Sequence, residues 1–131
     1  MRHELSTNQN HLKDYQKSIH TWEYLISYLS PGHKELGDCY FGLGVSYYEL
    51  NNIEEFILQN EKARDAYALA FGRSDIKYTK TLNSLGLGYK FNGEYKRAEK
   101  VLIDAKSIKE KSGISDIQYG RILNQLSLIL V

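Results

Sequence analysis

The feature that most constrains the fold of this chain is an internal repeat of about 41 residues. When the sequence is shifted by 41 positions, nine of the sixteen residues in 72–87 are identical to their counterparts in 113–128. The identical pairs are Gly72 and Gly113, Ser74 and Ser115, Asp75 and Asp116, Ile76 and Ile117, Tyr78 and Tyr119, Leu82 and Leu123, Asn83 and Asn124, Leu85 and Leu126, and Leu87 and Leu128. Periods of roughly 20 to 50 residues are typical of array proteins, in which each copy buries its apolar face on its neighbours.

Two earlier copies of the repeat are weaker. A shift of 42 gives the identical pairs Leu43 and Leu85, Gly44 and Gly86, Tyr47 and Tyr89, and Ala63 and Ala105. A shift of 80 places the segment 14–18 on the similar segment 94–98. We therefore interpret residues 1–131 as a single domain with repeats at approximately 1–31, 32–73, 74–114 and, incompletely, 115–131.

Within each copy the apolar residues recur at three- and four-residue spacing, which predicts amphipathic helices. Turn signals such as Asn92-Gly93 separate the helical segments, and Ser-Asp pairs at 74–75 and 115–116 are typical helix starts. The pattern predicts about seven helices, at roughly 2–11, 14–29, 34–50, 53–71, 75–91, 94–111 and 116–130. The expected fold class is all-α, a solenoid of antiparallel helix hairpins with about three and a half repeats.

The aligned residues resemble the tetratricopeptide repeat, whose signature is Trp-x2-Leu-Gly-x2-Tyr, then Ala-x3-Phe, then Ala. The third copy matches it with Leu82, Leu85, Gly86, Tyr89, Ala98, Leu102 and Ala105. The second copy carries Phe56 in the first alanine position, and this large side chain is expected to splay that repeat. The period of 41 to 42 residues exceeds the usual period of about 34. The longer form is similar to the repeats of kinesin light chains and of some bacterial arrays.

The resemblance implies a right-handed α-solenoid in which the first helix of each repeat lines a concave groove. It also implies a non-enzymatic protein-interaction or scaffolding module that binds a peptide or protein segment in that groove. The groove positions that we single out are Asn83, Asn124, Lys80, Leu87, Lys90, Arg121, Phe41 and Tyr48. The alternative is a regulatory region of a larger protein whose effector domain, such as a peptidase or DNA-binding domain, lies outside this chain.

Asn83 and Asn124 give the most specific hypothesis, because they occupy the same repeat position 41 residues apart. An amide side chain both donates and accepts, so this pair could hold the backbone of an extended peptide of any sequence. Lys80, Lys90 and Arg121 would favour an acidic peptide. The structural alternative is that the pair caps neighbouring helices or is only a remnant of repeat duplication.

Charge and composition indicate no further chemistry. Seventeen basic and sixteen acidic residues give a net charge of +1, so we expect neither a nucleic-acid nor a membrane partner. The four histidines and Cys39 lack metal-ligand spacing, and no nucleophile has a base and an orienting group, so we expect no cofactor, no metal and no enzyme activity. The polar N-terminus favours a cytoplasmic protein. Charge runs such as 109–111 are interpreted as solvated helix faces.

The last predicted helix is apolar on more than one face. Its apolar residues are Ile122, Leu123, Leu126, Leu128, Ile129, Leu130 and Val131. Terminal repeats normally present a polar surface to solvent. We therefore expect this surface to be covered, either by residues outside the chain or through self-association of the C-terminal helix with a second copy.

Overall fold

The computed structural model describes residues 2–130, and within them the side chains of residues 12–129. This part of the chain contains six α-helices and no strand, and 82% of the chain is helical. The helices are α1 (Arg2–Tyr28), α2 (Leu36–Glu49), α3 (Ile53–Phe71), α4 (Ile76–Phe91), α5 (Tyr95–Ser112) and α6 (Ile117–Leu130). The all-α prediction is confirmed, whereas the prediction of seven helices is wrong.

The difference lies in the first repeat, where the predicted break between 2–11 and 14–29 does not occur. α1 is one helix of 27 residues. No glycine or proline precedes Pro31, and Leu12 and Lys13 at the expected break are ordinary helix-forming residues. The segment 1–31 is therefore organised around one long helix and not a helix hairpin.

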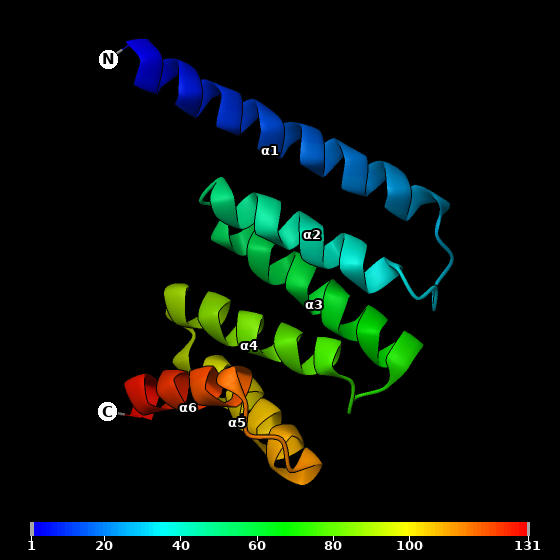
Figure 1. The fold of residues 1–131 in the computed structure, drawn as a ribbon, viewed down its shortest axis with the longest axis vertical. Helices are drawn as coiled ribbons and strands as arrows, with labels where there is room; N and C mark the ends of the chain where they lie inside the picture. The colour runs from blue at the N-terminus through cyan, green and yellow to red at the C-terminus, as the bar shows by residue number, and fades with distance from the viewer. Residues whose placement is uncertain (1, 131) are drawn as a thin grey trace.

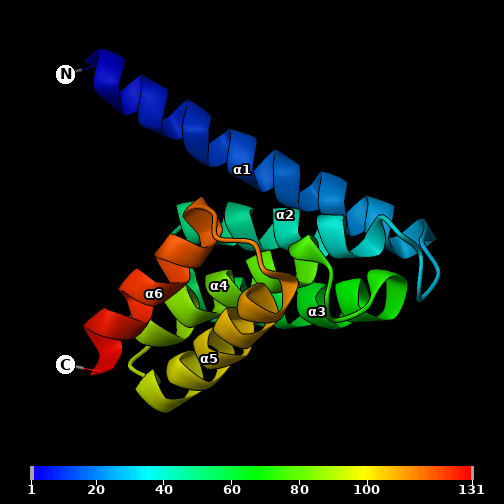
Figure 2. The ribbon, with the colours of Figure 1, turned by 60° about the horizontal axis from the view of Figure 1, so that its bottom comes forward.

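Helices α2 and α3 form one antiparallel hairpin, and α4 and α5 form a second (Figure 1). α1 lies at one end of the stack, and α5 and α6 lie at the other (Figure 1). Each helix packs mainly on the helices that precede and follow it in the chain, and α6 also contacts α4 (Figure 2). Packing between sequential neighbours is compatible with a helical repeat.

The two hairpins turn at equivalent positions. Asn51 and Gly93 both have positive φ, 61° and 78°. Glycine and asparagine tolerate this left-handed conformation best at the end of a helix. The helix starts predicted from the Ser-Asp pairs are also present, since Asp75 accepts a hydrogen bond from the backbone N–H of Lys77 at 2.8 Å and Asp116 accepts one from Tyr119 at 2.9 Å.

Small residues bring the helices of each repeat close together. A Cβ at position 86 would lie 2.6 Å from Leu102 Cδ2, so glycine is required for the observed contact between α4 and α5. The main core continues through α3, α4, α5 and α6, with Phe56, Ile57, Leu82, Leu85, Tyr89, Ala98, Val101, Leu102, Ala105, Ile122 and Leu126 buried. This core joins residues of the second, third and fourth predicted repeats into one packed unit.

The expected splaying of the second repeat by Phe56 does not occur. α2 and α3 make the most extensive contact of any two helices in the described residues. The Phe56 ring packs against Tyr48, with centroids 5.1 Å apart, and lies where a side chain at Gly88 of α4 would otherwise be. The ring therefore fills space toward the next repeat and does not push α2 and α3 apart.

α1 is held on α2 by the single tryptophan of the chain. A side chain at Gly42 would collide with the Trp22 indole, so the indole lies directly on the α2 backbone at this position. α1 therefore contacts α2 as α3 contacts α4, through a glycine on the later helix.

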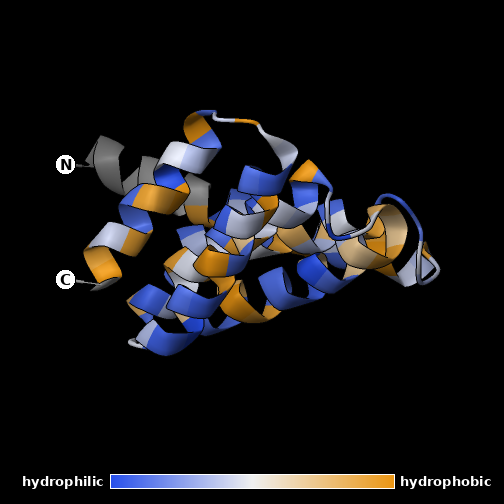
Figure 3. Ribbon diagram, turned by 90° about the horizontal axis from the view of Figure 1, so that it is seen from below, coloured by the Kyte–Doolittle hydropathy of each residue, from blue (hydrophilic) through white to orange (hydrophobic). Residues whose placement is uncertain are grey.

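The C-terminal helix is only partly buried. Ile122 and Leu126 belong to the core, and Ile129 packs against it. Leu123 and Leu128 are exposed, and the hydrophobic stretches of α6 are visible in Figure 3. The side chains of Leu130 and Val131 lie outside the described residues, so the predicted apolar surface is described only as far as Ile129. No helix in 2–130 has the length and apolar composition needed to cross a membrane.

Lys109 departs from its predicted role on a solvated face. The residue is buried, with 5% of its side chain exposed, and its ammonium group donates to Asp116 Oδ2 at 2.9 Å. Asp116 therefore both begins α6 and neutralises a buried cation at the end of α5.

Candidate functional site

Three of the predicted groove residues meet in a hollow between α2 and α4. The hollow has a volume of about 190 Å³ and is lined by Phe41, Val45, Tyr48, Phe56, Ser84 and Leu87. Phe41, Val45 and Tyr48 share one face of α2 because they are spaced by four and three residues, and Ser84 and Leu87 share one face of α4 for the same reason. The structure therefore brings Phe41, Tyr48 and Leu87 together in one hollow.

The hollow presents aromatic and aliphatic groups to solvent. Tyr48 stacks on Phe91 with ring centroids 6.5 Å apart, and packs on Phe56 at 5.1 Å. Val45 is 43% exposed and Phe91 is 55% exposed. Apolar groups that are fixed by packing below and open to water above are typical of an interaction surface.

One of the three predicted cations lies beside this hollow. The Lys80 ammonium group is 4.8 Å from the centroid of the Phe41 ring, a cation–π distance that holds the lysine beside the hollow. Lys90 is half-buried and Arg121 is exposed. Among the described side chains, none of these three forms an ion pair with a carboxylate. Within the described residues, no carboxylate therefore neutralises these three charges.

The predicted asparagine pair is arranged differently. Asn83 Oδ1 accepts a hydrogen bond from Nε2 of Gln125, which follows Asn124 on α6. Asn124 itself is exposed. The Gln125 Oε1 atom is buried and has no hydrogen-bond partner among the described residues. The structure therefore joins α4 to α6 through Asn83 and Gln125, and the contact of Asn83 and Asn124 with a peptide stays a prediction.

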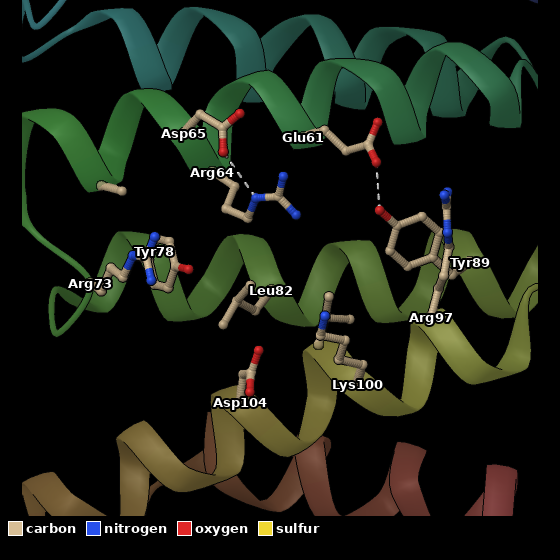
Figure 4. A pocket seen from close by; sticks show the side chains of 12 residues that line it. Glu61, Arg64, Asp65, Arg73, Tyr78, Leu82, Tyr89, Arg97, Lys100 and Asp104 are labelled. Carbon is tan, nitrogen blue, oxygen red and sulfur yellow. Dashed lines mark hydrogen bonds and ion pairs between the residues drawn. The ribbon is translucent and has the colours of Figure 1, made fainter.

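A second hollow, which the sequence did not predict, lies between α3 and α5 with α4 as its floor (Figure 4). Its volume is about 390 Å³, and it is lined by Glu61, Arg64, Asp65, Ala68, Arg73, Tyr78, Leu82, Tyr89, Arg97, Lys100, Val101 and Asp104. Both α3 and α5 pack on α4, but they share no extensive contact with each other in the described residues. The gap between them leaves the hollow.

A buried tyrosine forms part of the floor of this second hollow. The Tyr89 hydroxyl donates to Glu61 Oε2 at 2.6 Å, and the Arg97 guanidinium lies 5.7 Å from the centroid of the Tyr89 ring. Burial, followed by the hydrogen bond to Glu61, raises the pKa of Tyr89 to about 12. Tyr89 is therefore a neutral donor at physiological pH. The sequence signal for this hollow was the charged residues on α3 and α5, which periodicity alone assigns to solvated faces.

In 12–129, no group of three or more His, Cys, Asp or Glu side chains is placed to hold a metal ion. No family model matches this chain, and no curated protein shows a significant match to its sequence. The resemblance to tetratricopeptide repeats therefore depends on the aligned residues of the chain itself.

Proposed function

We propose that this chain is a non-enzymatic interaction module that binds a peptide or protein segment on the face formed by α2, α4 and α6. The proposal includes the right-handed solenoid that the resemblance implies. The observation that carries it is the exposed apolar hollow of Phe41, Val45, Tyr48, Ser84 and Leu87, with Phe56 beneath. The hollow lies between α2 of the second repeat and α4 of the third, so a bound segment would contact two repeats at once.

The size of the hollow supports a peptide and not a cofactor. At about 190 Å³ it is smaller than the roughly 300 to 1,000 Å³ of small-molecule pockets. A hollow of this size suits one anchoring side chain of a longer ligand, whose other residues lie along the helices. The ligand that fits best therefore carries an apolar or aromatic anchor.

The cations of α4 and α6 define the rest of the ligand. Lys80 lies beside Phe41, and Lys90 and Arg121 lie on the same helices as Leu87 and Asn124. Complementary charge favours acidic residues on either side of the anchor. Asn83 keeps its amide nitrogen available for a peptide carbonyl, because its hydrogen bond to Gln125 uses only the oxygen.

A randomised peptide display library tests this proposal and does not require the natural partner to be identified first. The chain is immobilised, bound peptides are selected, and one selected peptide is measured by titration calorimetry. We expect the selected peptides to combine an apolar anchor with acidic residues. Val45→Glu should weaken binding by about tenfold or more, because it places a carboxylate in the apolar hollow.

The matched control is Leu69→Glu, which makes the same kind of change at a residue of α3 that is 68% exposed. Thermal unfolding of both variants verifies that they are folded. If Val45→Glu binds the selected peptide as tightly as Leu69→Glu, the α2–α4–α6 face is not the binding surface.

A further inference from the structure

The second hollow lies on the opposite side of α4 from the proposed peptide site. Tyr78, Leu82 and Tyr89 in its floor are spaced by four and seven residues and share one face of α4. Leu87 in the peptide hollow lies about half a turn away from Tyr89 around the helix. A ligand could therefore occupy one hollow without touching the other.

Cations converge in this hollow from two helices. Arg64 reaches in from α3, and Arg97 and Lys100 reach in from α5, toward the space beside Tyr89 (Figure 4). Of the three carboxylates that line the hollow, Glu61 lies at this end, whereas Asp65 and Asp104 lie toward Tyr78 (Figure 4). The end of the hollow near Tyr89 is therefore positively charged.

The donors of these cations are only partly used within the protein. Arg64 donates through Nε to Asp65 Oδ1 at 3.1 Å, and no described residue accepts from its two Nη groups. Arg97 Nη1 lies 3.4 Å from Glu94 Oε1, and Lys100 has no ion pair with a described residue. Guanidinium groups with unused Nη donors are well suited to bind carboxylate or phosphate oxygens.

The aromatic floor fixes Arg97 in place. The Arg97 guanidinium is held over the Tyr89 ring, and the Tyr89 hydroxyl is fixed by Glu61. Arg64 is partly enclosed, with 28% of its side chain exposed, so its charge is less screened by water than that of a surface arginine. Donors that are already oriented lose little entropy when they bind an anion.

We propose that this hollow binds a ligand through an oxyanion, a phosphate or a carboxylate group, held between Arg64, Arg97 and Lys100. The volume of about 390 Å³ falls within the range of roughly 300 to 1,000 Å³ for small-molecule sites. It leaves room for a ligand body attached to the oxyanion. That body would extend toward Tyr78 and Asp104 at the other end.

The test is an NMR titration of the full chain with inorganic phosphate, with citrate, and with sodium chloride at matched ionic strength. We expect saturable amide shifts in 61–65 and 97–104 with at least one of the two oxyanions and not with chloride. A stronger response to phosphate identifies a phosphate group as the ligand chemistry, and a stronger response to citrate identifies carboxylates.

Arg64→Gln and Lys100→Gln should each weaken the better oxyanion by about tenfold, because each removes a charge-assisted hydrogen bond. The control is Lys111→Gln, an exposed lysine at the end of α5 that does not line the hollow. If neither oxyanion saturates, if chloride gives the same shifts, or if Arg64→Gln and Lys100→Gln bind as tightly as Lys111→Gln, the proposal is overturned. Val45→Glu should leave oxyanion binding unchanged, which separates this site from the peptide site.

Discussion

Gly86 and Gly120 lie in helices with very different surroundings. A Cβ on Gly86 would lie 2.6 Å from Leu102 Cδ2, whereas one on Gly120 would meet no atom of the described chain within 4 Å. Alanine is the better helix former by about 1 kcal/mol, so Gly120→Ala should raise the free energy of unfolding by roughly 0.5–1 kcal/mol. Gly86→Ala should lower it by about 1–3 kcal/mol, because Leu102 must move.

Urea denaturation of both variants measures this difference. Because the two substitutions are chemically identical, the comparison isolates the α4–α5 contact. An equal gain in stability for Gly86→Ala and Gly120→Ala would mean that α4 and α5 do not approach each other as closely as described.

Gly86 recurs as Gly44 in the second repeat, but Leu102 aligns with Asn60, so the repeat comparison drew attention to the glycine alone. The comparison did not predict the role of Gln125, whose amide joins α6 to Asn83. The repeat alignment draws attention to identical residues, and Gln125 aligns with Ser84 and not with another glutamine. A contact made by a residue that differs between repeats is therefore invisible to that comparison.

At the scale of helices, α1 shows where the repeat pattern failed. The similarity between 14–18 and 94–98 correctly aligned parts of two helices, but it did not require a turn before residue 14. A helix ends where the chain offers a turn residue or loses its packing partner. Residues 12 and 13 offer no turn, so the helix continues.

An ion pair links the end of α5 to the start of α6, with Lys109 Nζ 2.9 Å from Asp116 Oδ2. Removing the Asp116 carboxylate would leave the buried Lys109 ammonium group without its counter-charge. That is more destabilising than replacing the ammonium group itself by an apolar side chain, because no unpaired charge then stays buried. We therefore expect Asp116→Asn to lower the thermal midpoint more than Lys109→Met, since methionine keeps an unbranched side chain in the buried space. Asparagine also retains the helix cap.

This ion pair also gives a pH dependence. The hydrogen bond from Lys109, followed by the one from the Tyr119 backbone, lowers the pKa of Asp116 below its ordinary value of 3.8. The stabilisation is thus present above about pH 3.8 and is lost as the pH falls through the lower folded-state pKa. Thermal unfolding in acid should show a steeper loss for the wild type than for Asp116→Asn. Equal slopes, or a larger loss of stability in Lys109→Met at neutral pH, would contradict the ion pair.

For the molecule as a whole, the sequence predicted the α2–α4 hollow better than the α3–α5 hollow. Phe41, Tyr48 and Leu87 follow from position within the repeat, because that position decides which face of a helix a residue occupies. The second hollow depends on how far α3 and α5 separate over α4. Hydrophobic periodicity carries no information about that separation, so Arg64 and Lys100 looked like ordinary surface charges.

The two hollows lie on opposite sides of α4 and differ in their chemistry. One is apolar with Lys80 beside it, and the other is polar with cations inside it. Binding on the first side would order side chains of α2 and α4, whereas binding on the second would order side chains of α3 and α5. Measurements that resolve individual helices can therefore tell the two apart.

The most direct test of the proposed function is amide hydrogen exchange, read by mass spectrometry, with and without a peptide selected from the display library. If the peptide occupies the α2–α4–α6 face, exchange should slow in segments 41–48 and 84–91, and 61–65 and 97–104 should be unchanged. Protection that appears only in 61–65 and 97–104, or nowhere in α2 and α4 while calorimetry shows binding, would contradict the proposal that this face binds the peptide.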